Sequence, residues 1–172
     1  PADAKEAEKA TIALASIYGP AYIRLARSES EEFFDDRYEF KLGKAVTLRQ
    51  GRKASIIACG VMVQEAMSAA KQLEAEGIDV SVINMSSIKP LDVQAVVEAA
   101  KTGAIVTAED HNIIGGLGSA VAEVIAEKRL NVAFARIGAQ DRFAESGPAK
   151  ELFEKYGLSA RHIAEAVKKL IK

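Results

Sequence analysis

The sequence is poor in the features that mark several specialised classes of protein. It contains one cysteine among 172 residues, Cys59, which excludes an internal disulfide and fits a reducing compartment. The 23 Lys and Arg residues and the 24 Asp and Glu residues nearly cancel, and no basic tract stands out. Binding to nucleic acid or to an anionic membrane surface needs concentrated positive charge, so neither is expected as a partner.

Long apolar runs are absent as well. The longest are the length of a strand and are interrupted by glycine or charge, far short of the roughly 20 residues that cross a bilayer. We therefore expect no membrane span and a cytoplasmic location. The first residues, Pro1–Glu6, are polar and lack an initiating Met, so we expect no signal peptide and a chain cut from a longer one.

The remaining composition fits one globular domain with an attachment. Apolar residues make up 49% of the chain, which is enough for one ordinary core. Strand and helix patterns alternate, and this alternation is typical of a parallel sheet covered by helices. We predict a three-layer α/β fold with a doubly wound, mostly parallel sheet of about five strands and helices on both faces. Strands are expected at 45–48, 55–58, 80–83, 104–107 and 132–137, and helices near 3–17, 63–73, 93–100, 117–125, 149–156 and 159–170.

Three parts are expected along the chain. Residues 1–27 hold an Ala-rich helix and an extended run, 21–27, and one helix with one strand cannot form a core alone. Residues 28–43 are rich in charge and aromatic side chains, so we expect a linker that is packed down, because a free tether would be poor in aromatics. Residues 44–172 are predicted to form the domain proper.

The most informative stretch runs from Thr107 to Val121, where a strand, a turn, three glycines and a helix follow one another. The ends of parallel strands and the helix starts that follow them gather ligands, because free N–H groups and the helix dipole point there. The glycines lack the G-x-G-x-x-G spacing of a dinucleotide site. Two interpretations stay open, an anion or cofactor at the helix start or glycines that allow tight packing, and the spacing alone favours packing.

Four motifs stand in a fixed order along the chain. They are Gly19-Pro20-x-Tyr22-Ile23-Arg24-Leu25-x-Arg27, Ile88-Lys89-Pro90-Leu91-Asp92, Glu109-x-His111-Asn112-x-x-Gly115-Gly116-Leu117-Gly118-Ser119-Ala120-Val121 and Asp141-x-Phe143-x-Glu145-Ser146-Gly147. In order and spacing they resemble transketolases over essentially the whole chain, and most closely the short C-terminal half of transketolases that are split into two polypeptides. Two small departures are Ala144, where the family commonly has Gly, and Asp110, where a second Glu is usual.

The resemblance implies the C-terminal section of a thiamine-diphosphate-dependent transketolase, which transfers two-carbon ketol units between sugar phosphates, as in the pentose phosphate pathway. Residues 1–27 would then be the last helix and strand of the pyrimidine-binding domain. Deoxyxylulose-phosphate synthase and the beta subunits of 2-oxo acid dehydrogenases share the same C-terminal domain and stay open as alternatives, although the run from Phe143 to Gly147 favours transketolase. A non-catalytic assembly module is a further alternative.

The same resemblance defines the expected cofactors and partners. Thiamine diphosphate and Mg²⁺ are held by parts of the intact enzyme that this chain lacks, so we expect the fragment to bind neither and to be inactive alone. Its partner would be the N-terminal section of the same enzyme, in a homodimer or a heterotetramer.

Few residues are candidates for a site. The resemblance places Arg27 at the position of an arginine that binds sugar phosphates in transketolases. A guanidinium suits this role because it can pair two phosphate oxygens at once. From the residues alone, an ion pair with Glu29 or Glu31 is the alternative. His111 is a second candidate for substrate or interface contact, against a plain hydrogen-bonded loop residue. Arg24 is expected to be structural, Cys59 to be a core residue, and no catalytic residue or metal ligand is predicted.

Overall fold

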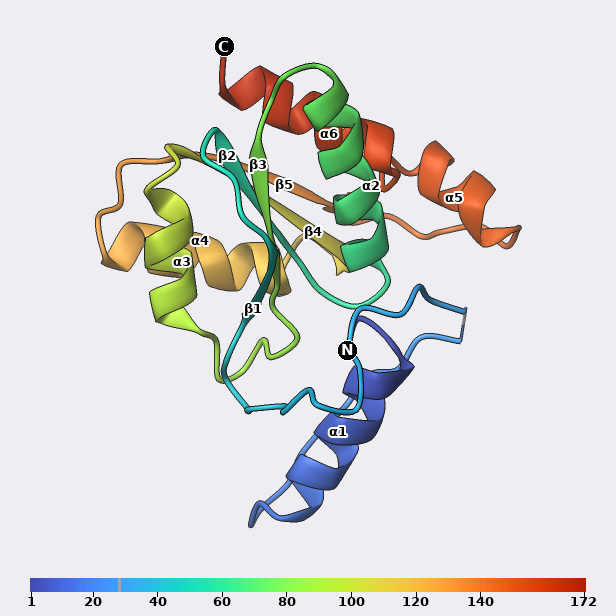
Figure 1. The fold of residues 1–172 in the computed structure, drawn as a ribbon. Helices are drawn as coiled ribbons and strands as arrows, with labels where there is room; N and C mark the ends of the chain where they lie inside the picture. The colour runs from blue at the N-terminus through green and yellow to red at the C-terminus, as the bar shows by residue number, and fades with distance from the viewer. Residues whose placement is uncertain (28) are drawn as a thin grey trace.

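The computed structural model describes residues 1–27 and 29–172 and contains one five-stranded sheet (Figure 1). The expected linker, 28–43, begins at Ser28, which lies outside the described residues. The strand order is β1-β3-β2-β4-β5, and β1 alone runs antiparallel to its neighbour while the other pairs are parallel. The strands are β1 (Val46–Arg49), β2 (Ala54–Ala58), β3 (Val80–Asn84), β4 (Ala104–Asn112) and β5 (Ala133–Ala139).

Helices cover both faces of this sheet, which confirms the predicted three-layer α/β fold. One face carries α2 (Met62–Ala75) and α6 (Ala160–Leu170), and the other carries α3 (Val93–Ala100) and α4 (Leu117–Glu127) (Figure 1). A short helix, α5 (Ala149–Lys155), precedes α6. Within the described residues, no helix is long and apolar enough to span a membrane.

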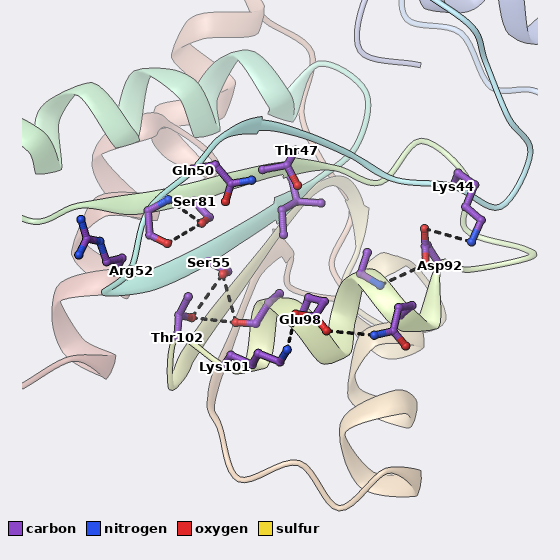
Figure 2. A pocket seen from close by; sticks show the side chains of 15 residues that line it. Lys44, Thr47, Gln50, Arg52, Ser55, Ser81, Asp92, Glu98, Lys101 and Thr102 are labelled. Carbon is purple, nitrogen blue, oxygen red and sulfur yellow. Dashed lines mark hydrogen bonds and ion pairs between the residues drawn. The ribbon is translucent and has the colours of Figure 1, made fainter.

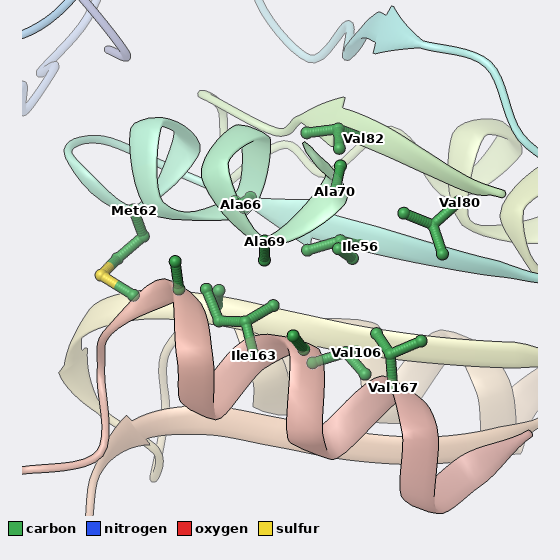
Figure 3. Close-up of a cluster of buried hydrophobic side chains, with 14 of the residues drawn as sticks. Ile56, Met62, Ala66, Ala69, Ala70, Val80, Val82, Val106, Ile163 and Val167 are labelled. Carbon is green, nitrogen blue, oxygen red and sulfur yellow. The ribbon is translucent and has the colours of Figure 1, made fainter. Parts of the chain in front are cut away.

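The core consists of two apolar clusters separated by the sheet. Successive strand residues point to opposite faces, so Ile56 joins the cluster under α2 and α6 while Ile57 joins the cluster under α3 and α4. On the first face, the small side chains of α2 allow α6 to approach closely, and Ile163 points from α6 toward α2 (Figure 3). Central strands buried on both faces explain the continuous apolar runs in the sequence.

Helix α1 (Ala4–Ala15) is joined to this body at its first turn and projects away from it (Figure 1). The carboxylate of Asp3 caps the helix by accepting the Glu6 N–H at 2.7 Å. Its second oxygen accepts the N–H groups of Phe33 and Phe34 at 2.6 and 2.9 Å. One buried side chain therefore ties the start of α1 to the segment that follows the tail in sequence.

A second buried carboxylate strengthens this attachment. Glu6 is fully buried and accepts hydrogen bonds from the Ala2 N–H, the Tyr38 hydroxyl and the Asn84 amide at 2.6 to 2.9 Å. The ring of Tyr38 stacks on Phe34 with centroids 3.9 Å apart. The aromatic segment is thus packed down, as its composition predicted, and the end of β3 is joined to α1.

Two predicted elements differ from the structure. Residues 21–27 form no strand, because a strand needs a neighbour for its backbone groups and none of the described strands pairs with this segment. Strand β4 was expected to end at Thr107, yet it continues to Asn112 because β5 extends beside it and Asn112 pairs with Ala139.

Candidate functional site

The carboxyl edge of the sheet brings together the segments that the sequence singled out. Strand β4 ends there with Glu109, Asp110 and His111, and the turn that follows leads into α4. Strand β5 ends beside it, and the Asn112 amide donates to the Asp141 carboxylate across the two strand ends at 2.8 Å. In a doubly wound sheet, ligands bind at this edge, so its side chains are the first candidates for a binding site.

The start of α4 already holds an anion, and that anion is Glu109. Its carboxylate is 2% exposed, and its two oxygens accept the N–H groups of Leu117 and Gly118, both at 2.7 Å. Free N–H groups and the positive end of the helix dipole stabilise a negative charge at this position. Because the Glu109 carboxylate occupies these N–H donors, the start of α4 is not free to bind a ligand phosphate.

The glycines next to Glu109 are explained by packing. A Cβ on Gly116 would lie 1.9 Å from the Glu109 Oε2 atom, and a Cβ on Gly118 would lie 2.9 Å from the Thr107 Oγ1 atom. Only a residue without a side chain lets the helix start approach β4 this closely. Sequence reasoning favoured packing here, but it missed Glu109 as the bound group. The available signal was an acidic residue directly after a strand and followed by a glycine turn.

Hydrogen bonds fix the turn between β4 and α4. The Ile114 N–H donates to the Asn112 side chain at 2.8 Å, and the Gly115 N–H donates to the Ser119 hydroxyl at 2.9 Å. The same hydroxyl donates to the Ile113 carbonyl at 3.0 Å. These bonds hold the turn while the Ile114 side chain stays exposed to solvent.

The two candidate site residues lie in segments that meet at this edge. Arg27 is exposed, and within residues 1–27 and 29–172 it makes no ion pair, including none with Glu29 or Glu31. His111 is exposed near the end of β4. In the same two segments, the Arg24 guanidinium donates to the Asp110 carbonyl at 2.7 Å and lies 3.8 Å from the Asp110 carboxylate. The roles of Arg27 and His111 stay predictions.

Within the described residues, the one cysteine is poorly reactive and the possible metal ligands do not cluster. Burial raises the pKa of the Cys59 thiol to about 12, so at neutral pH this thiol is protonated and is a poor nucleophile. In the part of the chain that the structure describes, no group of three or more His, Cys, Asp or Glu side chains is placed to hold a metal ion.

A groove of about 610 Å³ lies between β1 and α3, and its lining includes neither Arg27 nor His111 (Figure 2). Its floor hydroxyls are satisfied internally, since Ser55 donates to the Ala99 carbonyl and Ser81 donates to the Gly51 carbonyl. Its charges are largely paired as well, with Lys44 near Asp92 and Lys101 near Glu98. The groove therefore offers little unpaired charge to a ligand.

A family profile described as "Transketolase, C-terminal domain" matches residues 43–163. The chain belongs to this family. It is 46% identical over 149 residues to the 6-deoxy-6-sulfo-D-fructose transketolase subunit SqwH of Clostridium sp. (strain MSTE9), covering 86% of this chain and 46% of that protein. It is also 39% identical over 171 residues to the 1-deoxy-D-xylulose-5-phosphate synthase of Syntrophotalea carbinolica, covering 98% of this chain and 27% of that enzyme.

A solved structure agrees with the whole fold of this transketolase C-terminal domain. A chain described as a split gene transketolase, inactive beta4 tetramer, superposes with a TM-score of 0.95 at 46% identity. The superposition covers 99% of the present chain and 56% of that one. The chain thus spans about half the length of these transketolase relatives.

Proposed function

We propose that this chain is the C-terminal section of a thiamine-diphosphate-dependent transketolase that moves two-carbon ketol groups between sugar phosphates in carbohydrate metabolism. The observation that carries this proposal is the agreement with a split-gene transketolase over 99% of the chain. In such an enzyme, bound thiamine diphosphate supplies the carbanion that carries the ketol group. The residues of this chain would bind and orient the substrate.

Arg27 is the residue to which we assign the substrate contact. Its guanidinium is exposed and presents several N–H donors in a planar fork that matches two oxygens of a phosphate. A sulfonate has the same tetrahedral oxygen geometry, and one relative is named for a sulfonated fructose. We therefore propose a ketose with a terminal oxyanion as the substrate class, with a sugar phosphate as the first choice. His111, at the same edge, is a second contact candidate.

The described residues do not fit thiamine diphosphate or its metal ion. In residues 1–27 and 29–172, no group of three or more potential ligands is placed to hold a metal ion. Protein Mg²⁺ sites commonly use one or two carboxylates together with the phosphates of a bound ligand, so Mg²⁺ would bind where the diphosphate binds. The helix start that could hold a diphosphate is filled by Glu109. We propose that both groups bind to the complementary part of the enzyme. A saturable calorimetric titration of thiamine diphosphate into this chain alone would contradict this assignment.

The N-terminal tail, residues 1–27, supports the proposal that this chain binds the complementary part of the enzyme. Large apolar side chains are exposed along it, including Ile12, Tyr18 and Tyr22 at 61%, 106% and 87%. We propose that this tail is the end of a pyrimidine-binding domain, with residues 28–43 as linker and 44–172 as the C-terminal domain. The rest of the enzyme would cover its apolar surface in a homodimer or a heterotetramer.

The proposal is tested by a coupled ketol-transfer assay with fructose 6-phosphate as donor and ribose 5-phosphate as acceptor. We expect no activity from this chain alone and activity after it is combined with the complementary, cofactor-bound polypeptide. Persistent inactivity of the folded mixture would favour the assembly-module alternative. Formation of 1-deoxy-D-xylulose 5-phosphate from pyruvate and glyceraldehyde 3-phosphate would favour the synthase, the second candidate that its 39% identical relative supports.

Arg27→Ala in the reconstituted enzyme tests the substrate contact. We expect the KM for fructose 6-phosphate to rise about tenfold or more, because a charged hydrogen bond contributes roughly 1.5 to 3 kcal/mol. Arg37→Ala is the matched control, since Arg37 is also exposed but is bound to Asp35 in the linker. Equal KM values for the two variants would remove Arg27 from the site. The same assays with 6-deoxy-6-sulfofructose would distinguish a sulfonate from a phosphate.

A further inference from the structure

The last of the four sequence motifs, residues 141–147, has no role in the proposed substrate contact. It forms the loop that leaves β5 at the carboxyl edge of the sheet. Phe143, inside this loop, is 102% exposed, more than any other large apolar side chain of residues 29–172. The next most exposed is Ile114, in the turn that leaves the neighbouring strand β4. The two most exposed large apolar side chains of this part of the chain therefore lie at one edge of the sheet.

Polar contacts restrain the loop on both sides of Phe143. Before it, the Asp141 carboxylate accepts the Asn112 amide at 2.8 Å, which ties the loop to the end of β4. After it, the Glu145 N–H donates to the Tyr156 hydroxyl at 2.9 Å, which ties the loop to the end of α5. A large apolar side chain on a restrained loop loses less conformational freedom on binding than one on a free loop. Phe143 therefore has the properties of an interface anchor.

The rest of the enzyme is expected at this same edge. The chain matches 46% of the length of one transketolase relative, so an enzyme of that size contains a further part about as large as this chain. As a C-terminal section, this chain would contact that part through α1. The first turn of α1 lies at the carboxyl edge, where Glu6 accepts the side-chain amide of Asn84, the last residue of β3, at 2.9 Å. The tail thus begins at the edge where Phe143 and Ile114 face solvent.

From this arrangement we propose that Phe143 and Ile114 form a second docking surface for the complementary, cofactor-bearing part of the enzyme. Phe143 is the anchor, and it enters an apolar pocket of that partner. This inference rests on the proposed function and adds a contact that is far from the tail in sequence. Burial of the two side chains removes apolar surface from water and stabilises the assembly, without any contact to the substrate.

The test measures assembly directly, by calorimetric titration of this chain into the complementary, cofactor-bound polypeptide. We expect Phe143→Ala to raise the Kd about thirtyfold and Ile114→Ala about three- to tenfold, because an anchor contributes more than its neighbours. The matched control is Gln50→Ala, which truncates an exposed neutral side chain after β1, at the opposite edge, and should leave the Kd unchanged. The urea midpoint of the chain alone should be the same for all three variants, because each truncated side chain faces solvent.

Activity gives a second readout of the same surface. At a saturating concentration of the partner, kcat of Phe143→Ala should equal that of the unchanged protein, while half-maximal activity requires more partner. An unchanged Kd for Phe143→Ala would overturn the docking surface, even in a mixture that transfers ketol groups. Conversely, a mixture that shows the expected order of Kd values but transfers no ketol groups would contradict the proposed function and leave the docking surface in place.

A second copy of this chain is the alternative occupant. In that case, analytical ultracentrifugation of the chain alone would show self-association that Phe143→Ala abolishes, and the Kd for the complementary polypeptide would not change. This outcome would overturn the inference. We expect instead that Phe143→Ala weakens binding to the complementary polypeptide and leaves the sedimentation of the chain alone unchanged.

Discussion

The body of the protein, residues 44–172, and the N-terminal tail, residues 1–27, use the same kinds of side chain in opposite ways. In the body, large aliphatic residues such as Ile56 and Ile163 are fully buried between helices and sheet. In the tail, Ile12 and Tyr18 are exposed. The small Ala2 joins the first core cluster, and Glu6 and Arg24 supply polar ties to the body. Apolar packing builds the domain, whereas a few directed hydrogen bonds locate a segment that has no core of its own.

The largest effect is expected where the body is packed most closely. Gly116→Ala would place a Cβ 1.9 Å from the Glu109 Oε2 atom and force this buried carboxylate off its N–H donors. We expect a loss of about 3 to 5 kcal/mol in the free energy of unfolding, measured by urea denaturation, or failure to fold. The control is Gly115→Ala, where the Cβ meets open space and the positive φ costs about 1 to 2 kcal/mol. Similar losses in both variants would contradict the packing explanation.

The two buried carboxylates allow a direct comparison of body and tail. Glu109→Gln replaces one acceptor oxygen by an NH₂ group that faces a backbone N–H donor, so we expect a loss of about 2 to 3 kcal/mol. Glu6→Gln should cost about 1 kcal/mol or less, because the new NH₂ group can take the place of Oε1 and donate to the Tyr38 hydroxyl, which can accept as well as donate, while the remaining oxygen keeps the Ala2 N–H and the Asn84 amide as donors. Urea denaturation measures both values, and a larger loss for Glu6→Gln would reverse the comparison.

The fold was predictable from the sequence because its signals are local. Runs such as Ile56-Ile57 and Val80-Ile83, followed by helical spacing, indicated alternating strands and helices with ends close to those observed. The antiparallel placement of β1 at the sheet edge and the strand order had no such signal, because they depend on contacts between residues far apart in the chain. Strand β4 was predicted too short for the same reason, since its charged end, Glu109–Asn112, resembles a loop until β5 is placed beside it.

The candidate site was predictable only in part. Family motifs indicated Arg27 and His111, but no local pattern could show that Arg24 reaches Asp110 across 86 positions of sequence. Glu109 belongs to a motif that assigns it no role, because a buried acid and an exposed one look alike in sequence. The Glu109 contacts depend on the turn that brings α4 against β4, and the Arg24 contact depends on where the tail meets the end of β4. Both arrangements arise only after the sheet has formed.

The smallest effect is expected where an apolar residue of the tail faces solvent. Ile12→Ala on α1 should change the free energy of unfolding of this chain by less than about 0.5 kcal/mol, because Ile12 is 61% exposed and Ala is the better helix former. The same substitution at Ile163, which is fully buried, should cost about 2 to 5 kcal/mol. In the reconstituted enzyme, where we propose that the tail is covered, Ile12→Ala should become costly and weaken assembly, measured by analytical ultracentrifugation. An effect that stays negligible there would show that the apolar residues of the tail remain in solvent, and the contrast between tail and body would then persist in the assembled protein.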